Sequence, residues 1–253
     1  MAHPAPRALP ENAGLAFVGE RMAVAACIPL KMAERMLGTR NPHGKPNADV
    51  LRRLVTAADP RHPGLLWQID FPAGMGEREA SLYEHPFHHL YRSVRSDRDG
   101  WWINPYADAR LRAILARRER YLATPVGAEP PGFRWFESSI IPDDTLLAVA
   151  RDDDFTHGVL QARPFALWWR QFHSRRTPTL ALKTYPFPWP PPTALSALSA
   201  AQEEQRHAVA RAVRGSDADQ LNSAVSAVYG WPADETDDER LARLLELNRQ
   251  RAG

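Results

Sequence analysis

The stretch LLWQIDF (residues 65–71) is the most strand-like segment of the chain, because a run of large apolar residues lies between turn-forming prolines and a glycine. Other strand-like segments lie at residues 121–124, 133–137 and 145–150, and a hairpin is expected at 15–28. Apolar residues at helical spacing predict helices at 29–37, 47–55, 84–95 and 108–120, and in the middle of 155–176. A chain that mixes both kinds of element in this way is predicted to be α+β.

A proline-rich segment, PFPWPPP (residues 186–192), divides the sequence into two parts, because proline continues neither a helix nor a central strand. After it, the apolar spacing predicts helices alone, at residues 199–214, 216–229 and 234–251. Residues 1–14 are rich in proline and alanine and carry no pattern. We therefore expect a flexible arm at 1–14, a mixed α/β domain at 15–192 and a small all-helical domain at 193–253.

The composition excludes several classes of protein. With 253 residues, 44% of them hydrophobic, the chain has enough apolar surface for a buried core. Its single cysteine, Cys27, excludes an internal disulfide framework and a zinc finger built on cysteines, and a reducing compartment is the simple interpretation. No apolar run approaches the roughly eighteen residues of a membrane helix, and the first residues lack the apolar core of a signal peptide. We expect a cytoplasmic protein without membrane contact.

The positive charge is concentrated before the last helices. Residues 1–195 contain 25 Lys and Arg against 20 Asp and Glu, a net charge of +5, whereas residues 196–253 contain 7 against 10, a net charge of −3. Nearly all the cations are arginines, whose planar guanidinium group suits phosphates and the edges of guanine. A GC-rich genome would also enrich arginine over lysine, so composition alone leaves both explanations open.

Motifs for catalysis are missing from the sequence. Neither a G-x-G-x-x-G nor a G-x-x-x-x-G-K-[ST] loop occurs, so backbone N–H groups have no glycine-rich turn at which to hold a cofactor. The segment NPYA (residues 104–107) lacks the second proline and the final aromatic of the Asn-Pro-Pro-Tyr loop of amino-methyltransferases, and it fits a proline-initiated helix start. Pro142, Asp143 and Asp144 lack the following lysine of a metal nuclease. We expect no catalytic residue in this chain and no cofactor bound by it.

Two clusters have the residue types of a metal site. Glu84, His85, His88 and His89 share a predicted helix face, but no further ligand lies near them in the sequence. The acidic run at residues 152–154 has the carboxylates of a magnesium site, but it also fits a turn that caps the next helix and pairs with arginines. We favour the simpler interpretation for both clusters and expect no metal.

A series of short motifs resembles, in order and spacing, the target recognition domain of MmeI-like adenine-specific DNA methyltransferases, the type IIL restriction-modification enzymes. The motifs are NADVL (47–51), WQIDF (67–71), YEHPF (83–87), WW (101–102), YLATP (121–125), ARDDDFTHGVL (150–160), RTPT (176–179) and TYPFPW (184–189). The segments LNSAV (221–225), YGWP (229–232) and ARLLELN (242–248) resemble the helical C-terminal domain of the same family. The resemblance covers nearly the whole chain.

The resemblance implies a DNA specificity part that works with a partner. Members of the family carry, ahead of this region, a methyltransferase domain that binds S-adenosylmethionine, and often a nuclease domain. This chain is then expected to bind double-stranded DNA and to select its sequence, while a methyltransferase catalytic subunit or domain binds S-adenosylmethionine and methylates adenine N6 in a restriction-modification or phage-defence system. The chain is either the product of a split gene or an excised domain. By itself it is not expected to be an enzyme.

The resemblance also indicates which residues face DNA. The candidates for contacting bases are Arg163, Arg170, Gln171, His173, Arg175 and Arg176, with Arg134 and Thr124 as second choices. Arg117, Arg118 and Arg120, at the end of a predicted helix, are the candidates for contacting phosphates. Most of the tryptophans lie in apolar runs, so we expect them in the core and not stacked on bases.

Two other hypotheses stay open at this point. The chain could be an adaptor in a defence complex that retains the recognition-domain fold without selecting a sequence. It could also be a metal-dependent hydrolase that uses Glu84, His85, His88 and the aspartates at 152–154. Salt-dependent binding to a DNA duplex distinguishes DNA recognition from the adaptor hypothesis. The metal content of the purified protein tests the hydrolase hypothesis.

Overall fold

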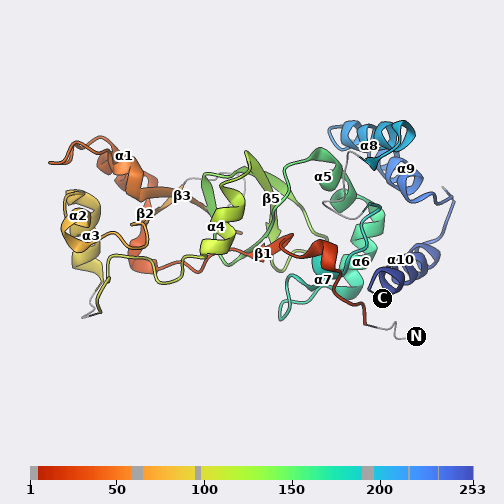
Figure 1. Cartoon of the computed structure of the whole chain (residues 1–253), viewed down its shortest axis with the longest axis horizontal. Coiled ribbons are helices and arrows are strands. Elements are labelled where there is room, and N and C mark those ends of the chain that lie inside the picture. Colours follow the sequence, from red (N-terminus) through yellow and green to blue (C-terminus); the bar gives the residue numbers. More distant parts are fainter. Residues whose placement is uncertain are drawn as a thin grey trace. The chain divides into compact units, whose positions relative to one another are not determined.

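The computed structural model describes residues 5–58, 65–94, 98–189, 197–215, 217–232 and 234–252 (Figure 1). Two compact units make up the chain. Unit 1 consists of Met1–Val18, Arg118–Trp135 and Leu147–Gly253, and unit 2 consists of Gly19–Arg117 and Phe136–Leu146. Both units contain strands and helices, which confirms the α+β class.

Unit 2 is built on a four-stranded sheet with the order β2-β4-β3-β7. The strands β2 (Cys27–Pro29) and β3 (Leu51–Val55) both pair antiparallel with β4 (Leu66–Ile69), and β7 (Ile140–Pro142) pairs parallel with β3. The central strand β4 is the core of the LLWQIDF segment, as the sequence predicts. Its residues Gln68 and Ile69 are buried, and so is Phe71 just beyond it.

Helices and short turns surround this sheet. They are η2 (Val24–Ala26), α1 (Leu30–Leu37), η3 (Asn47–Val50), α2 (Glu77–Ala80), α3 (Glu84–Ser93) and α4 (Ala109–Leu115). Helix α1 ends at Gly38, as predicted. Helix α4 begins after Asp108, whose side chain accepts hydrogen bonds of 2.9 Å from the backbone N–H groups of Arg110 and Leu111.

Two predictions for the early chain are wrong. The predicted helix over residues 47–55 is a 3-10 turn, η3, followed by strand β3, because pairing with β4 and β7 on both sides outweighs the helical spacing of Leu51 and Leu54. The predicted hairpin over residues 15–28 does not form either. Its first strand, β1 (Ala16–Val18), pairs with β8 (Leu146–Val149), and its second strand, β2, pairs with β4.

A second sheet, with the order β1-β8-β5-β6, lies mostly in unit 1. Strand β5 (Arg120–Pro125) is central, and β6 (Arg134–Glu137) forms one edge. The helices of unit 1 are η1 (Pro10–Asn12), α5 (Asp154–Gln161), α6 (Arg163–Phe172), α7 (Leu180–Thr184), α8 (Ala200–Ala212), α9 (Ala218–Tyr229) and α10 (Asp237–Arg251). Hydrogen bonds between Thr236 and Glu239 form a capping box at the start of the last helix.

The segment 155–176, predicted to be helical in its middle, forms two helices, α5 and α6, which the extended residue Ala162 separates. Helix α6 carries the main aromatic residues of the core, since Phe165, Trp168 and Trp169 are at most 1% exposed. Trp102 of unit 2 is also buried. The other five tryptophans are partly buried and pack against the apolar clusters of the two units: Trp67, Trp101, Trp135, Trp189 and Trp231.

The helices after the proline-rich segment share one core with the rest of unit 1. Val209, Val225 and Leu244 are fully buried and belong to the same apolar cluster as Trp168. Figure 1 shows α8, α9 and α10 beside α5 and α6, and contacts join α8 to α5 and α10 to α6. The predicted domain boundary at residues 192 and 193 lies outside the described residues and stays a prediction.

The described part of the predicted arm is held against this core instead of being free. Asn12 is 1% exposed, and its side-chain amide donates hydrogen bonds to the carbonyls of Leu182 (3.0 Å) and Tyr185 (2.8 Å). The amide of Asn248 in α10 likewise donates to the carbonyls of Arg7 (2.8 Å) and Thr184 (2.6 Å). A lack of regular pattern in the sequence does not exclude such anchoring, because it depends on two single polar side chains.

Gly158→Ala is expected to destabilise unit 1, because α5 packs on α8 at this glycine. An added Cβ would lie 2.5 Å from the Cγ1 atom of Val209, which is fully buried and has no room to move. Overpacking of this kind costs roughly 1–3 kcal/mol, more than the gain in helix propensity from alanine. Thermal unfolding measures the effect, with Gly132→Ala as the control because no atom lies within 4 Å of its added Cβ. Equal melting temperatures for the two variants would contradict the packing argument.

Candidate nucleic-acid interface

Helix α6 is fixed by its two tryptophans, and this decides which of its residues face solvent. The indole N–H of Trp168 donates to the carbonyl of Ala181 (3.1 Å), and that of Trp169 donates to the carbonyl of Ala128 (2.9 Å). Both rings are buried, so the helix cannot rotate about its axis without losing apolar contacts and hydrogen bonds together. Arg170 and Gln171, two of the residues predicted to contact bases, are exposed on the opposite side.

Arg163, at the start of α6, is engaged with the C-terminal helices. Its guanidinium group makes two hydrogen bonds, of 2.6 and 2.9 Å, with the carboxylate of Asp237, and its backbone N–H donates to Asn222 (2.8 Å). The bond from Arg163 lowers the pKa of Asp237, so the pair is charged at neutral pH. Arg163 and Arg170 both line a hollow of about 500 Å³ between α6, α9 and α10.

Three predicted residues follow the end of α6. The ring of His173 stacks on that of Trp169, with 3.9 Å between the ring centroids and an angle of 8° between the planes. Burial lowers the pKa of His173, so its imidazole is neutral at pH 7. Arg175 and Arg176 are exposed, and the guanidinium group of Arg175 lies against Gly127. The structure thus brings His173 and Arg175 to the loop 126–132, which connects β5 to β6.

The two second choices differ in their exposure. Arg134 is exposed on the edge strand β6. Thr124 is 1% exposed, and its hydroxyl accepts a hydrogen bond from the backbone N–H of Gly132 (3.1 Å). In this conformation Thr124 holds the base of the loop 126–132 and does not reach the surface.

The residues predicted to contact phosphates do not lie on one helix end, because α4 ends at Leu115. Arg117 is exposed and belongs to unit 2. Arg118 pairs with Asp152 (3.4 Å), whereas Arg120 bonds to Asp154 (2.9 Å) and lies 3.9 Å from the ring centre of Trp135. The charges of Arg118 and Arg120 are therefore partly neutralised by neighbouring carboxylates.

Those carboxylates belong to the acidic run at residues 152–154. Asp153 caps helix α5 by accepting a hydrogen bond from the backbone N–H of Thr156 (2.7 Å), and Asp154 also pairs with Arg214. This is the capping and ion-paired turn of the simpler interpretation. Among the described residues there is no group of three or more His, Cys, Asp or Glu side chains that could hold a metal ion, and this holds also for the histidines of α3.

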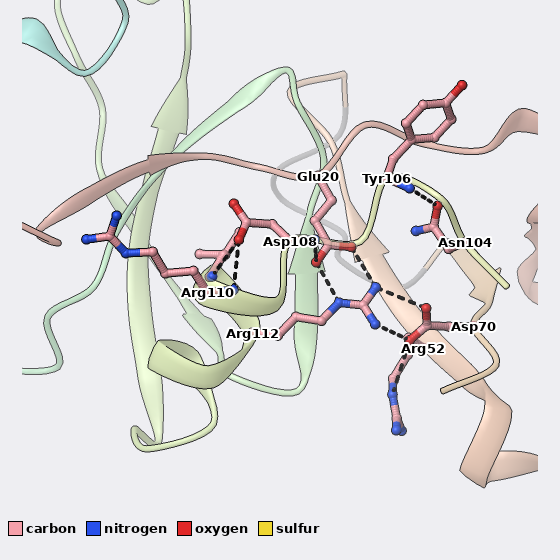
Figure 2. A network of polar contacts seen from close by, with 9 residues as sticks. Glu20, Arg52, Asp70, Asn104, Tyr106, Asp108, Arg110 and Arg112 are labelled. Carbon is pink, nitrogen blue, oxygen red and sulfur yellow. Dashed lines mark hydrogen bonds and ion pairs between the residues drawn. The ribbon is translucent and has the colours of Figure 1, made fainter. Parts of the chain in front are cut away.

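Unit 2 contains a buried ion-pair network that sequence reasoning missed. Figure 2 shows the guanidinium group of Arg112 between the carboxylates of Glu20 and Asp70. It bonds to Glu20 at 2.6 Å through two nitrogens and to Asp70 at 2.7 and 3.0 Å. The side chains of Glu20 and Asp70 are 1% and 5% exposed. Burial disfavours the charge of Arg112, but its bonds to Glu20 and Asp70 outweigh burial and raise its pKa above the ordinary value.

The network connects three distant parts of the sequence. Glu20 precedes β2, Asp70 follows β4, and Arg112 lies on α4, so the cluster fixes this helix to the sheet. Glu20 also accepts a hydrogen bond from the backbone N–H of Asp108 (3.2 Å), and Arg52 lies 4.0 Å from Asp70. No single short motif contains all three residues, so no local signal marks the cluster. The single acid in LLWQIDF, Asp70, was the one clue, because an acid at the end of an apolar strand needs a partner.

Comparisons with known proteins show a similarity at the level of the fold. No protein-family model matches the chain, and no curated protein matches it. Among solved structures, the chain is similar to the type IIL restriction-modification enzyme MmeI in complex with DNA, with a TM-score of 0.60 and 14% sequence identity. The similarity covers 99% of this chain but only 36% of the MmeI chain. At this identity the similarity shows a shared fold, which includes both units and the C-terminal helices.

No helix within the described residues is both long and apolar enough to cross a membrane.

Arg112→Gln is expected to destabilise unit 2 strongly. The change leaves the carboxylates of Glu20 and Asp70 buried without their cation, which costs roughly 3 kcal/mol. Chemical denaturation of the purified variant measures the loss. Arg117→Gln, an exposed arginine just after α4, serves as the control and is expected to unfold like the wild type. A stable Arg112→Gln variant would mean that the network does not hold α4 in place.

Asp154 is expected to make stability depend on pH in the acidic range. Burial opposes its ionisation, but bonds and charges from Arg214 and Arg120 outweigh burial and lower its pKa. A carboxyl whose folded-state pKa is lowered contributes stability above its ordinary pKa of about 4, and this contribution is lost as the pH falls towards the lowered value. Asp154→Asn should therefore melt below the wild type at pH 7, and the difference should shrink below about pH 4. A difference in melting temperature that stays constant with pH would contradict the assignment of this stability to the ionised carboxylate of Asp154.

Proposed function

We propose that this chain is the DNA-binding specificity part of a restriction-modification or phage-defence system, in which it selects a DNA sequence for a partner N6-adenine methyltransferase. The observation that carries the proposal is the similarity of nearly the whole chain to a part of MmeI, an enzyme whose structure was solved in complex with DNA. The series of short motifs, which occur in the same order as in that family, is a second line of support that comes from the sequence and not from the fold.

The exposed arginines near α6 support a DNA-binding role for unit 1. Arg170, Arg175 and Arg176 are exposed, as is Gln171, and they carry the paired donors that contact base edges or phosphates. Arg134 adds a further exposed cation on β6. Arg163, Arg118 and Arg120 are held by carboxylates, so in the proposed complex they position the neighbouring segments more than they contact bases.

The chemistry is assigned to the partner in this proposal. The sequence contains neither a glycine-rich cofactor loop nor an Asn-Pro-Pro-Tyr motif, so the partner would bind S-adenosylmethionine and transfer its methyl group. The chain alone is then expected to incorporate no labelled methyl group from S-adenosylmethionine into DNA. Incorporation well above the blank would contradict the assignment of the chemistry to a partner.

Binding of the chain to double-stranded DNA is expected to depend strongly on salt. About four to six phosphate contacts would give a slope of roughly −4 to −5 for the logarithm of the binding constant against the logarithm of the salt concentration. Arg117→Ala, which removes the exposed one of the three arginines predicted to contact phosphates, should reduce the steepness of the slope by about one. The matched control is Arg249→Ala, an exposed arginine on α10 that pairs with Glu246, and it should leave the slope unchanged.

Selection from duplexes with a randomised central segment tests whether a sequence is chosen. Enrichment of one motif by the chain, alone or with the co-purified methyltransferase, supports the proposal. A salt slope near zero together with no enrichment would contradict it and favour an adaptor that has the fold without DNA recognition. One observation favours the adaptor as the second candidate function. Arg163, Arg118 and Arg120 form ion pairs with carboxylates, which reduces the positive charge that is free to contact DNA.

A further inference from the structure

We propose that Gly127 is a positioning residue for DNA selection, because it allows the guanidinium group of Arg175 to lie against the loop 126–132. This inference rests on the proposed function. It adds to that function a specific arginine, and a glycine that acts through it.

The contact between Gly127 and Arg175 leaves no room for a side chain. An added Cβ at Gly127 would lie 2.8 Å from Nε, 2.8 Å from one terminal nitrogen and 3.0 Å from Cζ of Arg175. The two nitrogens are nearer than Cζ, so the side of the guanidinium group that carries Nε and this terminal nitrogen is turned towards the glycine, and the other terminal nitrogen lies farther away. Any residue other than glycine would occupy this space, so residue 127 decides whether Arg175 takes this place.

The surface on which Arg175 rests is held from several sides. The hydroxyl of Thr124 accepts from the N–H of Gly132 (3.1 Å) at the end of the loop, and the N–H of Ala128 donates to the carbonyl of Pro125 (3.1 Å) within it. The indole of Trp169 donates to the carbonyl of Ala128 (2.9 Å) from α6. A side chain added at residue 127 would therefore displace the flexible end of Arg175 and not the loop.

The donors of Arg175 suit recognition of a base. Guanidinium N–H groups pair with O6 and N7 of guanine, and the terminal nitrogen of Arg175 that lies farther from Gly127 is not blocked by the glycine. Arg175 is exposed, and it forms no ion pair with another described residue. In Arg163, by contrast, Nε and one terminal nitrogen donate to the carboxylate of Asp237. Of these two arginines, only Arg175 has donors that no carboxylate occupies.

The loop offers a matched pair of variants to test this. Gly127→Ala moves Arg175, whereas Gly132→Ala adds the same methyl group in the same loop with no atom within 4 Å. Neither glycine has a left-handed φ, so both backbones accept alanine. The assay is selection from randomised duplexes by the full chain, with the co-purified methyltransferase where one is obtained. We expect Gly127→Ala to reduce the preference at one or two base pairs about tenfold, with an unchanged melting temperature, and Gly132→Ala to match the wild type.

Arg175→Ala and the double variant show whether the glycine acts through the arginine. We expect Gly127→Ala combined with Arg175→Ala to have the same preference as Arg175→Ala alone, because the methyl group then has nothing to displace. A further loss in the double variant would overturn the inference, and so would a Gly127→Ala preference equal to that of the wild type. In both of these cases the wild type still selects a sequence and the proposed function stands. A wild type that enriches no motif overturns the function and the inference together.

Discussion

Burial of the tryptophan pair of α6 is the interaction on which unit 1 depends. An indole ring contributes a large apolar surface, but its N–H group needs an acceptor when it leaves water. Trp168 finds this acceptor in α7 and Trp169 finds it in the loop after β5, so one helix holds two segments that lie far from each other in the sequence. Because both rings point inward, the orientation of α6 is fixed, and its polar residues form a surface whose geometry does not depend on their own contacts.

The arginines, which dominate the cations of the chain, divide into two groups with different physical roles. Arginines of the first kind pair with carboxylates, as Arg112 does with Glu20 and Asp70, and Arg163 does with Asp237. Their ion pairs take the place of apolar contacts where strands and helices from distant parts of the chain meet. In the other group, which includes Arg170 and Arg175, the donors face solvent. Composition counts both groups alike, which is why the excess of arginine alone did not distinguish a DNA-binding surface from a genomic bias.

Local patterns predicted elements whose own residues determine them. The LLWQIDF strand, helix α1 and helix α10 follow from apolar spacing and from residues close to them in the sequence. Residues 47–55 could not be assigned in this way, because a short apolar run fits a helix or a strand and distant partners decide between them. For the candidate site, the family resemblance indicated the segment around α6. It did not indicate that the guanidinium group of Arg163 pairs with the carboxylate of Asp237, or that Thr124 is buried. Both depend on contacts between distant parts of the fold.

The chain passes between the two units four times, near residues 18, 117, 135 and 146. Unit 2 is therefore an insertion made of two pieces, and its strand β7 arrives on the second piece to pair with β3 on the first. A recombination event with a single breakpoint in either piece would separate β7 from its partner or divide the sheet of unit 1. Natural or engineered exchange of unit 2 as a module thus requires four junctions at once, whereas the short segments after β5 and after α6 can be replaced within unit 1 without crossing any of them.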